Sequence, residues 1–432
     1  MNNKPTTIKE LCEFIWYLED KYDLLDFECN GVKVWQYTRM KLYYRLAEAS
    51  GVLSQAHSRL SKLDKVKHLL GYIKNSLMDN YFTLQQKDVV VFSHSRVVDV
   101  DGELIDIYTK YFIDELIDAD QKILEFESPY LGIHRKNKTN FTHYLDWIAL
   151  SQRLYSIFLK VVISHDELKT IKKIENEINK ICKININLVV FFTKKIKTYK
   201  SVYFIYNKIF KKIKPKKLYI VVSYGQSDII KAAKNNNIEV IELQHGTFSK
   251  YHLGYSFPDR EKILDYFPDK FYVWNKYWKN LIKLPIDDEY VVIDKFRYLE
   301  KQKLKFKHLS KNQNQIVVLS QGAIGNAIAE KFLEHFYRFE NYTIKYKLHP
   351  GEFDRWKNYP ALKELSKFNN VEVLKSEIPL YELFATSSIQ VGVFSTALYE
   401  GVEFGCETIL LNISGIEYME QFINNIDVKI LK

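Results

Sequence analysis

Three short polar motifs contain residue types suited to phosphate or sugar chemistry, and each follows a run of β-branched and apolar residues. They are Gln244-His245-Gly246-Thr247 after IEVIEL, His349-Pro350 after TIKYKL, and Ser395-Thr396 after IQVGVF. Runs of this kind, separated by helical patterns, predict strands of a parallel sheet. Open parallel sheets bind ligands beyond the carboxyl ends of their strands, where loops and helix N-termini converge. We therefore expect the three motifs to meet in one groove.

Ser395 and Thr396 are predicted to begin a helix, where free N–H groups and the helix dipole attract phosphate and two hydroxyls add donors. Glu400 follows about one helical turn later, so its carboxylate could reach the hydroxyls of a nucleotide ribose. The alternative is a plain helix cap with a glutamate on the helix surface.

His349 is predicted to project into the cleft, because Pro350 withholds an N–H and fixes the backbone where the strand ends. Its imidazole could donate a hydrogen bond to a departing phosphate oxygen. Lys347 could add positive charge, although a lysine facing solvent explains this residue equally well. The sequence shows no obvious DxD metal motif, so we expect neither a metal nor a cofactor.

Two further loops are expected to contact the donor. Gly246 allows close backbone approach beside Thr247, and His245 could bind phosphate or assist deprotonation of an acceptor. A structural turn would also account for a lone His-Gly pair. Gln321 and Gly322, after QIVVLS, form a flexible loop suited to the donor phosphates, without the spacing of a dinucleotide-binding fingerprint.

The loop after DVVVFS is dense in ionisable residues. Asp101 or Glu103 is the candidate general base of an inverting reaction, and His94 and Arg96 are expected on the acceptor side. An acidic helix N-terminus would explain the same carboxylates through the helix dipole, since a helix is predicted from about Leu104.

The 432 residues are 47% hydrophobic and 15% aromatic, which favours a folded α/β protein with two domains and an additional helical segment. We expect two Rossmann-like domains that face a cleft. The predicted ranges are 1–85 for an N-terminal helical extension, 86–270 for the first Rossmann-like (acceptor) domain, 271–312 for a hinge, and 313–432 for the second (donor) domain.

The formal charge of +10 is unevenly distributed, because residues 194–217 hold ten lysines and no acid. This segment is predicted to be one basic amphipathic helix that contacts an anionic inner membrane surface. A solvated lysine face is an equal alternative, and no motif supports nucleic-acid binding. The N-terminus lacks the pattern of a signal peptide and no apolar run spans a bilayer, so we expect a cytoplasmic protein with possible peripheral membrane contact. The four widely spaced cysteines predict free thiols.

Taken together, LQHGT, KLHPGE and GVFSTALYEGVEFGC resemble bacterial capsule and surface-carbohydrate glycosyltransferases of the GT-B fold, with motifs similar to those of sialyltransferases and Kdo transferases. The resemblance covers roughly residues 218–425. It implies that His349 contacts the donor phosphate or assists departure of the nucleotide, and that Ser395 and Thr396 hold the phosphate. It also implies a CMP- or UDP-sugar donor and a lipid-linked or oligosaccharide acceptor belonging to a capsule, O-antigen or lipooligosaccharide.

Four other classes compete with this interpretation. A teichoic-acid type polyol-phosphate transferase would use the same motifs on CDP-glycerol. A UDP-sugar 2-epimerase shares the fold but would not need the basic helix or the helical extension. A non-catalytic polysaccharide-assembly protein and a nucleic-acid-binding protein are the alternatives outside enzymes. The sequence does not distinguish retention from inversion of configuration.

Overall fold

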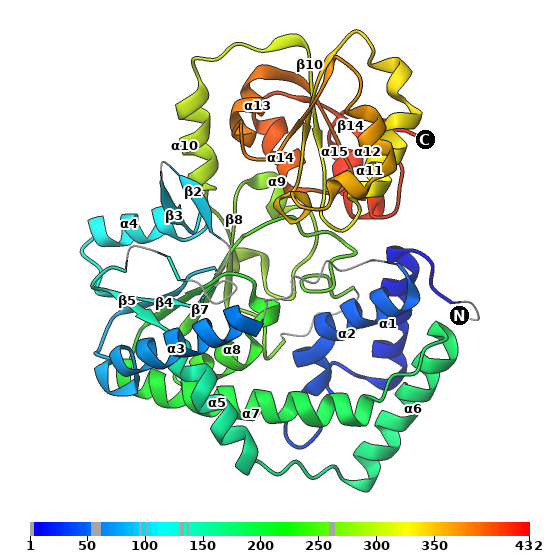
Figure 1. Ribbon diagram of the computed structural model, residues 1–432. Coiled ribbons are helices and arrows are strands. Elements are labelled where there is room, and N and C mark those ends of the chain that lie inside the picture. Colours follow the sequence, from blue (N-terminus) through cyan, green and yellow to red (C-terminus); the bar gives the residue numbers. More distant parts are fainter. Residues whose placement is uncertain are drawn as a thin grey trace.

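Two parallel sheets organise the chain, one in the lower and one in the upper half of the view (Figure 1). The computed structural model describes residues 4–52, 62–94, 97–100, 102–129, 134–135, 138–258 and 264–432. The first sheet has seven strands in the order β5-β4-β1-β6-β7-β8-β9, and the second has six in the order β12-β11-β10-β13-β14-β15. All pairs within these two sheets are parallel. The predicted α/β class with two Rossmann-like domains is therefore confirmed.

The first sheet is built from short, largely buried strands. Its strands are β1 (Val89–Phe92), β4 (Ile123–Glu127), β5 (Thr142–Tyr144), β6 (Lys217–Ile220), β7 (Glu239–Leu243), β8 (Lys270–Val273) and β9 (Val291–Ile293). The associated helices are α4 (Lys110–Asp118), α5 (Asp146–Phe158), α6 (His165–Cys182), α7 (Leu188–Ile213), α8 (Ser227–Lys234) and α9 (Lys276–Lys279), with short 3-10 turns η1 (Tyr81–Thr83), η2 (Ser223–Gly225) and η3 (Asp288–Tyr290). All four residues of β1 are buried, as expected for a parallel strand covered on both faces.

The second sheet follows the alternation of strand and helix expected from the sequence. Its strands are β10 (Asn312–Leu319), β11 (Thr343–Lys347), β12 (Val371–Leu374), β13 (Ser387–Gly392), β14 (Glu407–Leu411) and β15 (Val428–Leu431). The helices are α11 (Gly325–Glu334), α12 (Pro360–Leu365), α13 (Leu380–Thr386), α14 (Thr396–Glu403) and α15 (Glu420–Asn425), with 3-10 turns η4 (Phe336–Arg338), η5 (Pro350–Glu352), η6 (Trp356–Asn358) and η7 (Ile416–Met419). Helix α10 (Arg297–Phe306) precedes β10 and lies beside the upper domain (Figure 1).

The N-terminal segment is helical, as predicted, with α1 (Ile8–Tyr22), α2 (Val34–Ser50) and α3 (Lys62–Met78). A buried ion pair ties α1 to α2, because Arg39 Nε donates to Glu19 Oε1 at 2.6 Å and both side chains are at most 4% exposed. One hydrophobic cluster contains residues of α1 and α2 together with residues of α13, α14 and α15. Helices α1 and α2 therefore share a core with the second domain, whereas α3 packs against α5 of the first domain.

Three parts of the chain differ from the sequence-based expectations. The loop after β1 forms a hairpin of β2 (Val98–Val100) and β3 (Glu103–Ile105), and the following helix begins at Lys110 rather than near Leu104. Strand β9 and all but the first residue of β8 fall in the range 271–312 assigned to a hinge. Yet β8 pairs with β7 and β9 pairs with β8, so both belong to the first sheet. Their three or four residues are too short to show a clear period among the surrounding charged loops.

The lysine-rich range 194–217 also differs from the expected single helix, because it contains the end of a helix and the start of a strand. Helix α7 ends at Ile213, Lys214 adopts a left-handed conformation with φ of 54°, and Lys217 begins β6. Pro215 explains this end, because the residue before a proline avoids the helical region. The apolar side of α7 is buried, and the helix packs against α2, α5, α6 and α8.

Candidate functional site

The carboxyl ends of the central strands carry the three motifs, as the sequence predicts. In the second sheet the strand order reverses between β10 and β13, because the chain proceeds outward from β10 to β12 and then returns to β13. Gln321 and Gly322 follow β10, and Phe394, Ser395 and Thr396 follow β13. Such a switch point is where open parallel sheets bind ligands. The amide of Phe394 donates to Gln321 Oε1 at 3.3 Å, which joins the two loops.

The motif of the first domain contacts the motif of the second. Gly246 and Thr247 follow β7, and the Thr247 amide donates to Thr396 Oγ1 at 3.3 Å. A Cβ on Gly246 would lie 3.2 Å from the same oxygen. The glycine is therefore required for the close approach of the two loops. Residues 245 and 395, one on each domain, lie next to this contact.

His349 lies beside the loop that follows β10. The amide of Gly351 donates to its Nδ1 at 3.1 Å, so a neutral imidazole keeps its proton on Nε2. A Cβ on Gly322 would lie 3.0 Å from the same Nδ1. The loop thus packs directly on the imidazole. Together with the Gln321–Phe394 bond, this contact connects His349 to the start of α14.

Glu352 is a buried residue that joins the turn of His349 to the end of β10. Its side chain is fully buried and accepts hydrogen bonds from the His349 amide at 3.0 Å and from Ser320 Oγ at 3.0 Å. Burial raises the pKa of Glu352, although these hydrogen bonds oppose the rise. A Cβ on Gly325 would stand 1.6 Å from Glu352 Oε1, so Gly325 leaves the space that this carboxylate fills. Glu352 therefore fixes the positions of the two loops around His349.

Ser395 caps α14, because its side chain accepts from the Ala397 amide at 3.2 Å. Thr396 is the first residue of that helix, as predicted. Glu400 is 8% exposed and accepts a hydrogen bond from Tyr381 Oη at 2.8 Å. The glutamate is therefore buried beside an aromatic side chain rather than on an open helix surface.

His245 lies in a pocket of aromatic and acidic residues. Tyr255 Oη lies 3.3 Å from His245 Nδ1 and donates to Glu242 Oε1 at 2.5 Å. Burial, followed by the nearby His252 and His94, lowers the pKa of His245 to about 3. Burial raises the pKa of Glu242 to about 7 against its hydrogen bonds from Ser223 and Tyr255. His245 is therefore neutral near pH 7. Because the Tyr255 hydroxyl donates its proton to Glu242, it can only accept a hydrogen bond from His245, so the proton of the neutral imidazole lies on Nδ1.

The loop after β1 approaches His245 across β6, which lies between β1 and β7 in the sheet. The ring of His94 lies 6.2 Å from the ring of His245 and 5.4 Å from that of Tyr108. Buried Asp106 fixes this loop by accepting from the amides of His94 at 2.7 Å and Tyr108 at 2.9 Å. Burial raises the pKa of Asp106 to about 6, against its hydrogen bonds.

Two residues assigned to this loop, Arg96 and Asp101, lie outside the described residues. Glu103 is exposed on β3, where it belongs to the β2–β3 hairpin and not to the start of a helix. Lys347 directs its ammonium toward the Ile378 carbonyl at 2.6 Å, and burial lowers its pKa. Pro350 is exposed at the first position of η5.

Besides Glu352, four side chains at the site were missed by the sequence reasoning. Glu242 is a charged residue between two apolar residues, Ile241 and Leu243, within a predicted strand, and this contrast is a usable signal. Tyr255 and Asp106 act through contacts that no local pattern reveals. Arg355 donates to the Gly322 carbonyl and lies near His349, while its Nε is buried without a hydrogen-bond partner. A guanidinium in this position is suited to an anionic ligand.

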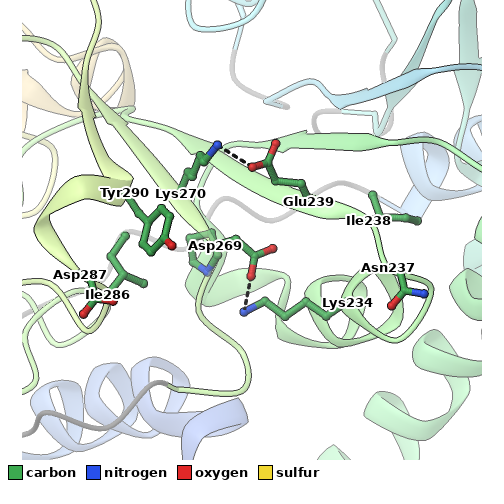
Figure 2. Close-up of a pocket in the computed structure, with 10 residues that line it drawn as sticks. Lys234, Asn237, Ile238, Glu239, Asp269, Lys270, Ile286, Asp287 and Tyr290 are labelled. Carbon is green, nitrogen blue, oxygen red and sulfur yellow. Dashed lines mark ion pairs between the residues drawn. The ribbon is translucent and has the colours of Figure 1, made fainter.

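An open pocket of about 560 Å³ lies at the amino ends of strands of the first sheet, the edge opposite to the motif-bearing loops (Figure 2). Glu239 and Lys270, at the amino ends of β7 and β8, line it and pair at 2.6 Å. Lys234 and Asp269 form a second pair at 3.0 Å. Both lysines of the pocket are thus paired with acidic residues of its lining, and the pocket is separate from the motif-bearing loops. Among the described residues, no group of three or more histidine, cysteine, aspartate or glutamate side chains could hold a metal ion.

The fold and the meeting of carboxyl-end loops define a two-domain α/β protein of the GT-B type. No family model matches the sequence, and no curated relative matches it. Among solved structures, the chain is similar to the UDP-GlcNAc 2-epimerase of Methanocaldococcus jannaschii, with 9% identity, a TM-score of 0.45, and coverage of 79% of this chain and 88% of that one.

Two other solved structures show similarity of the same order. The UDP-GlcNAc 2-epimerase of Neisseria meningitidis bound to UDP-GlcNAc has 15% identity, a TM-score of 0.45, and coverage of 79% of this chain and 86% of that one. Spinosyn rhamnosyltransferase SpnG complexed with spinosyn aglycone has 10% identity, a TM-score of 0.44, and coverage of 80% and 86%. These similarities are too distant to assign an activity.

Proposed function

We propose that this protein is a glycosyltransferase that moves a sugar from a nucleotide-sugar donor to a growing surface glycan, such as a capsule, O-antigen or lipooligosaccharide. The single observation that supports this proposal is the contact of Gly246 and Thr247 with Thr396, which unites the carboxyl-end loops of both domains. Two substrates held by opposite domains can then react between them.

The donor nucleotide is assigned to the second domain. Its phosphates would lie between the start of α14 and His349, where Ser395, Thr396 and Arg355 supply donors or positive charge. The protonated Nε2 of His349 donates to the phosphate oxygen on which negative charge develops as the glycosidic bond breaks. Glu400, oriented by Tyr381, is assigned to the ribose hydroxyls.

The acceptor is assigned to the first domain, near His94 and His245. With Nδ1 facing Tyr255, the Nε2 atom of neutral His245 can accept a hydrogen bond from an acceptor hydroxyl and orient it. Asp101 or Glu103 is the candidate general base. We propose that the reaction requires no metal, which a transfer assay with and without EDTA tests directly.

A thermal-shift panel of CMP, CDP, UDP, GDP and their sugar conjugates tests the donor assignment. We expect one nucleotide to raise the melting temperature by mass action, and its sugar conjugate to be consumed when acceptor glycan is added. Arg355→Ala should remove most of the shift, whereas Arg338→Ala, on η4, should leave it unchanged. Release of CMP from CDP-glycerol, with no turnover of any nucleotide sugar, would contradict the proposal.

A further inference from the structure

Two helices of the first domain expose apolar residues on their outer sides. On α3, Leu70, Ile73 and Leu77 recur at intervals of three and four residues and are between 46% and 77% exposed. Residues at this spacing lie on one side of a helix. Phe82, in η1 directly after α3, is 86% exposed. Large side chains clustered in this way on a surface indicate an interaction site.

Helix α5, which packs against α3, exposes a second apolar stripe. Leu154, Ile157 and Phe158 are 63%, 72% and 82% exposed and lie on one side of α5. Helices α3 and α5 pack against each other and lie together in the lower part of the first domain (Figure 1). We call the combined surface the α3/α5 face. Its members are Leu70, Ile73, Leu77, Phe82, Leu154, Ile157 and Phe158.

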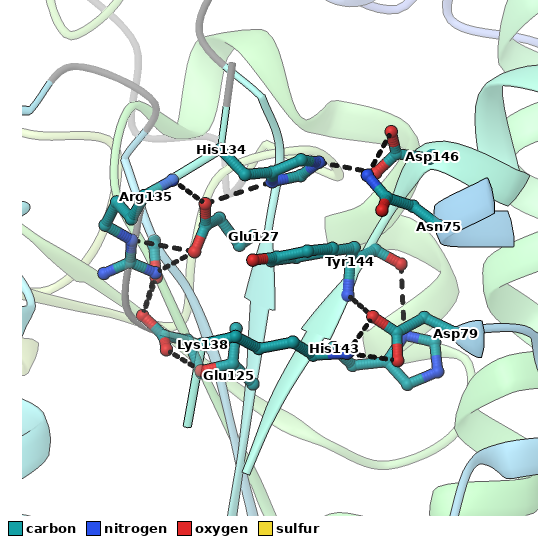
Figure 3. Close-up of polar contacts among 12 residues, drawn as sticks. Asn75, Asp79, Glu125, Glu127, His134, Arg135, Lys138, His143, Tyr144 and Asp146 are labelled. Carbon is teal, nitrogen blue, oxygen red and sulfur yellow. Dashed lines mark hydrogen bonds and ion pairs between the residues drawn. The ribbon is translucent and has the colours of Figure 1, made fainter. Parts of the chain in front are cut away.

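A buried polar network holds both helices in place (Figure 3). Asp79, directly after α3, pairs with Lys138 at 2.6 Å and accepts from the Tyr144 amide at 2.9 Å. Asp146, the first residue of α5, pairs with His134 at 2.7 Å. Asp79 thus ties the end of α3 to strand β5, and Asp146 ties the start of α5 to His134, so an anchored pair of helices presents the apolar stripes.

The surroundings of the α3/α5 face are positively charged. The sequence contains no aspartate or glutamate in residues 65–78, 147–165 and 178–227. Lys212 of α7 donates to the Phe82 carbonyl at 3.0 Å. Lys208 lies 4.4 Å from the ring of Phe204, which stacks on Tyr155 of α5 at 4.5 Å. Lysines of α7 therefore lie next to η1 and close to α5.

We infer that the α3/α5 face docks on an anionic lipid surface. Apolar side chains enter the interfacial region while surrounding lysines attract acidic headgroups, as in peripheral helices with a basic rim. The charge distribution favours acidic lipid over an apolar protein partner. The apolar side of α7 is buried, so α7 contributes lysines and not the inserting residues. This inference does not depend on the transferase proposal, because it concerns a surface distinct from the motif-bearing loops.

Co-sedimentation of the full chain with vesicles tests the inference. We expect binding to vesicles of phosphatidylglycerol and phosphatidylcholine in equal parts, and at least about tenfold weaker binding to phosphatidylcholine alone, because the lysines are attracted only to acidic headgroups. The Ile157→Ser/Phe158→Ser variant should bind the acidic vesicles at least about tenfold more weakly, since two large apolar side chains no longer enter the interfacial region.

Leu304→Ser is the matched control, because Leu304 of α10 is 65% exposed and lies outside the α3/α5 face. It should bind the vesicles as the wild-type protein does. Lys160 is exposed two residues after the end of α5. Lys160→Gln/Lys208→Gln should weaken binding to acidic vesicles at low salt while leaving the melting temperature unchanged. Equal binding by the wild type and the Ile157→Ser/Phe158→Ser variant would overturn the inference. A dimer in the absence of lipid that the same variant abolishes would also overturn it and indicate a second copy of the chain as the partner.

Discussion

The hydrogen bond between the Gly351 amide and His349 Nδ1 decides which nitrogen of the imidazole carries the proton. The motif His-Pro-Gly places the glycine amide two residues after the histidine, so the sequence itself supplies this contact. What the sequence did not reveal is Glu352, which orients the same turn from a buried position. Arg355 and Glu242 were missed for a similar reason, because their roles depend on loops that are distant along the chain.

Replacement of His349 by alanine should lower kcat/KM about 100-fold, because one donor to the developing phosphate charge is lost. The effect is measured with the nucleotide sugar that the thermal-shift panel selects. His308→Ala is the control, since His308 is exposed after α10 and should leave kcat/KM unchanged. Equal activity of both variants would exclude His349 from the chemistry.

At the scale of elements, the strands β4 and β5 are held by a charged network centred on His134 and Arg135 (Figure 3). Burial on its own lowers the pKa of His134, but hydrogen bonds to Asp146 and Glu127 outweigh burial and raise the pKa to about 9. Arg135 donates to Glu127 Oε2 at 2.8 Å and to Glu125 Oε1 at 2.5 Å. No local sequence pattern predicts this network, since it joins a loop, two strands and two helices.

Protonated His134 should stabilise the fold at neutral pH, and this stabilisation should be lost at alkaline pH. Its pKa is about 6.5 in the unfolded chain and about 9 in the folded chain, so its contribution is complete below pH 6.5 and is lost as the pH rises to 9. We expect the contribution to be about 1–2 kcal/mol after screening by solvent. Urea unfolding of the wild type and His134→Gln should differ by this amount at pH 6 and converge near pH 9.5. A difference that is independent of pH would contradict the assignment.

At the scale of the whole molecule, the two domains and the N-terminal helices are joined by continuous apolar packing. Trp278 of the first domain packs on Tyr399 of α14 with ring centres 4.5 Å apart, and Tyr399 packs on Phe422 at the same distance. The hydroxyl oxygens of Tyr43 in α2 and Tyr418 in η7 are 2.5 Å apart and share a hydrogen bond. We therefore expect the domains to unfold together.

Tyr399→Ala should lower the free energy of unfolding by about 3 kcal/mol, because the buried ring is removed and a cavity remains. Urea unfolding followed by far-ultraviolet circular dichroism and by tryptophan fluorescence should still give coincident transitions. Tyr337→Ala is the control, since Tyr337 is 62% exposed and its loss should change stability by less than about 0.5 kcal/mol. Separate transitions for the two probes would show that the domains unfold independently.

The sequence by itself determined the α/β class, the helical N-terminal segment and the position of each motif at the end of a strand. These features are local, because the alternation of apolar strand and amphipathic helix is written in consecutive residues. Only the tertiary structure decided which loops meet. Gly246 reaches Thr396 because two sheets face each other, and Tyr255 reaches His245 because a loop folds back over β7. Strand order and domain contact arise from packing between residues far apart in the chain, which no local period encodes.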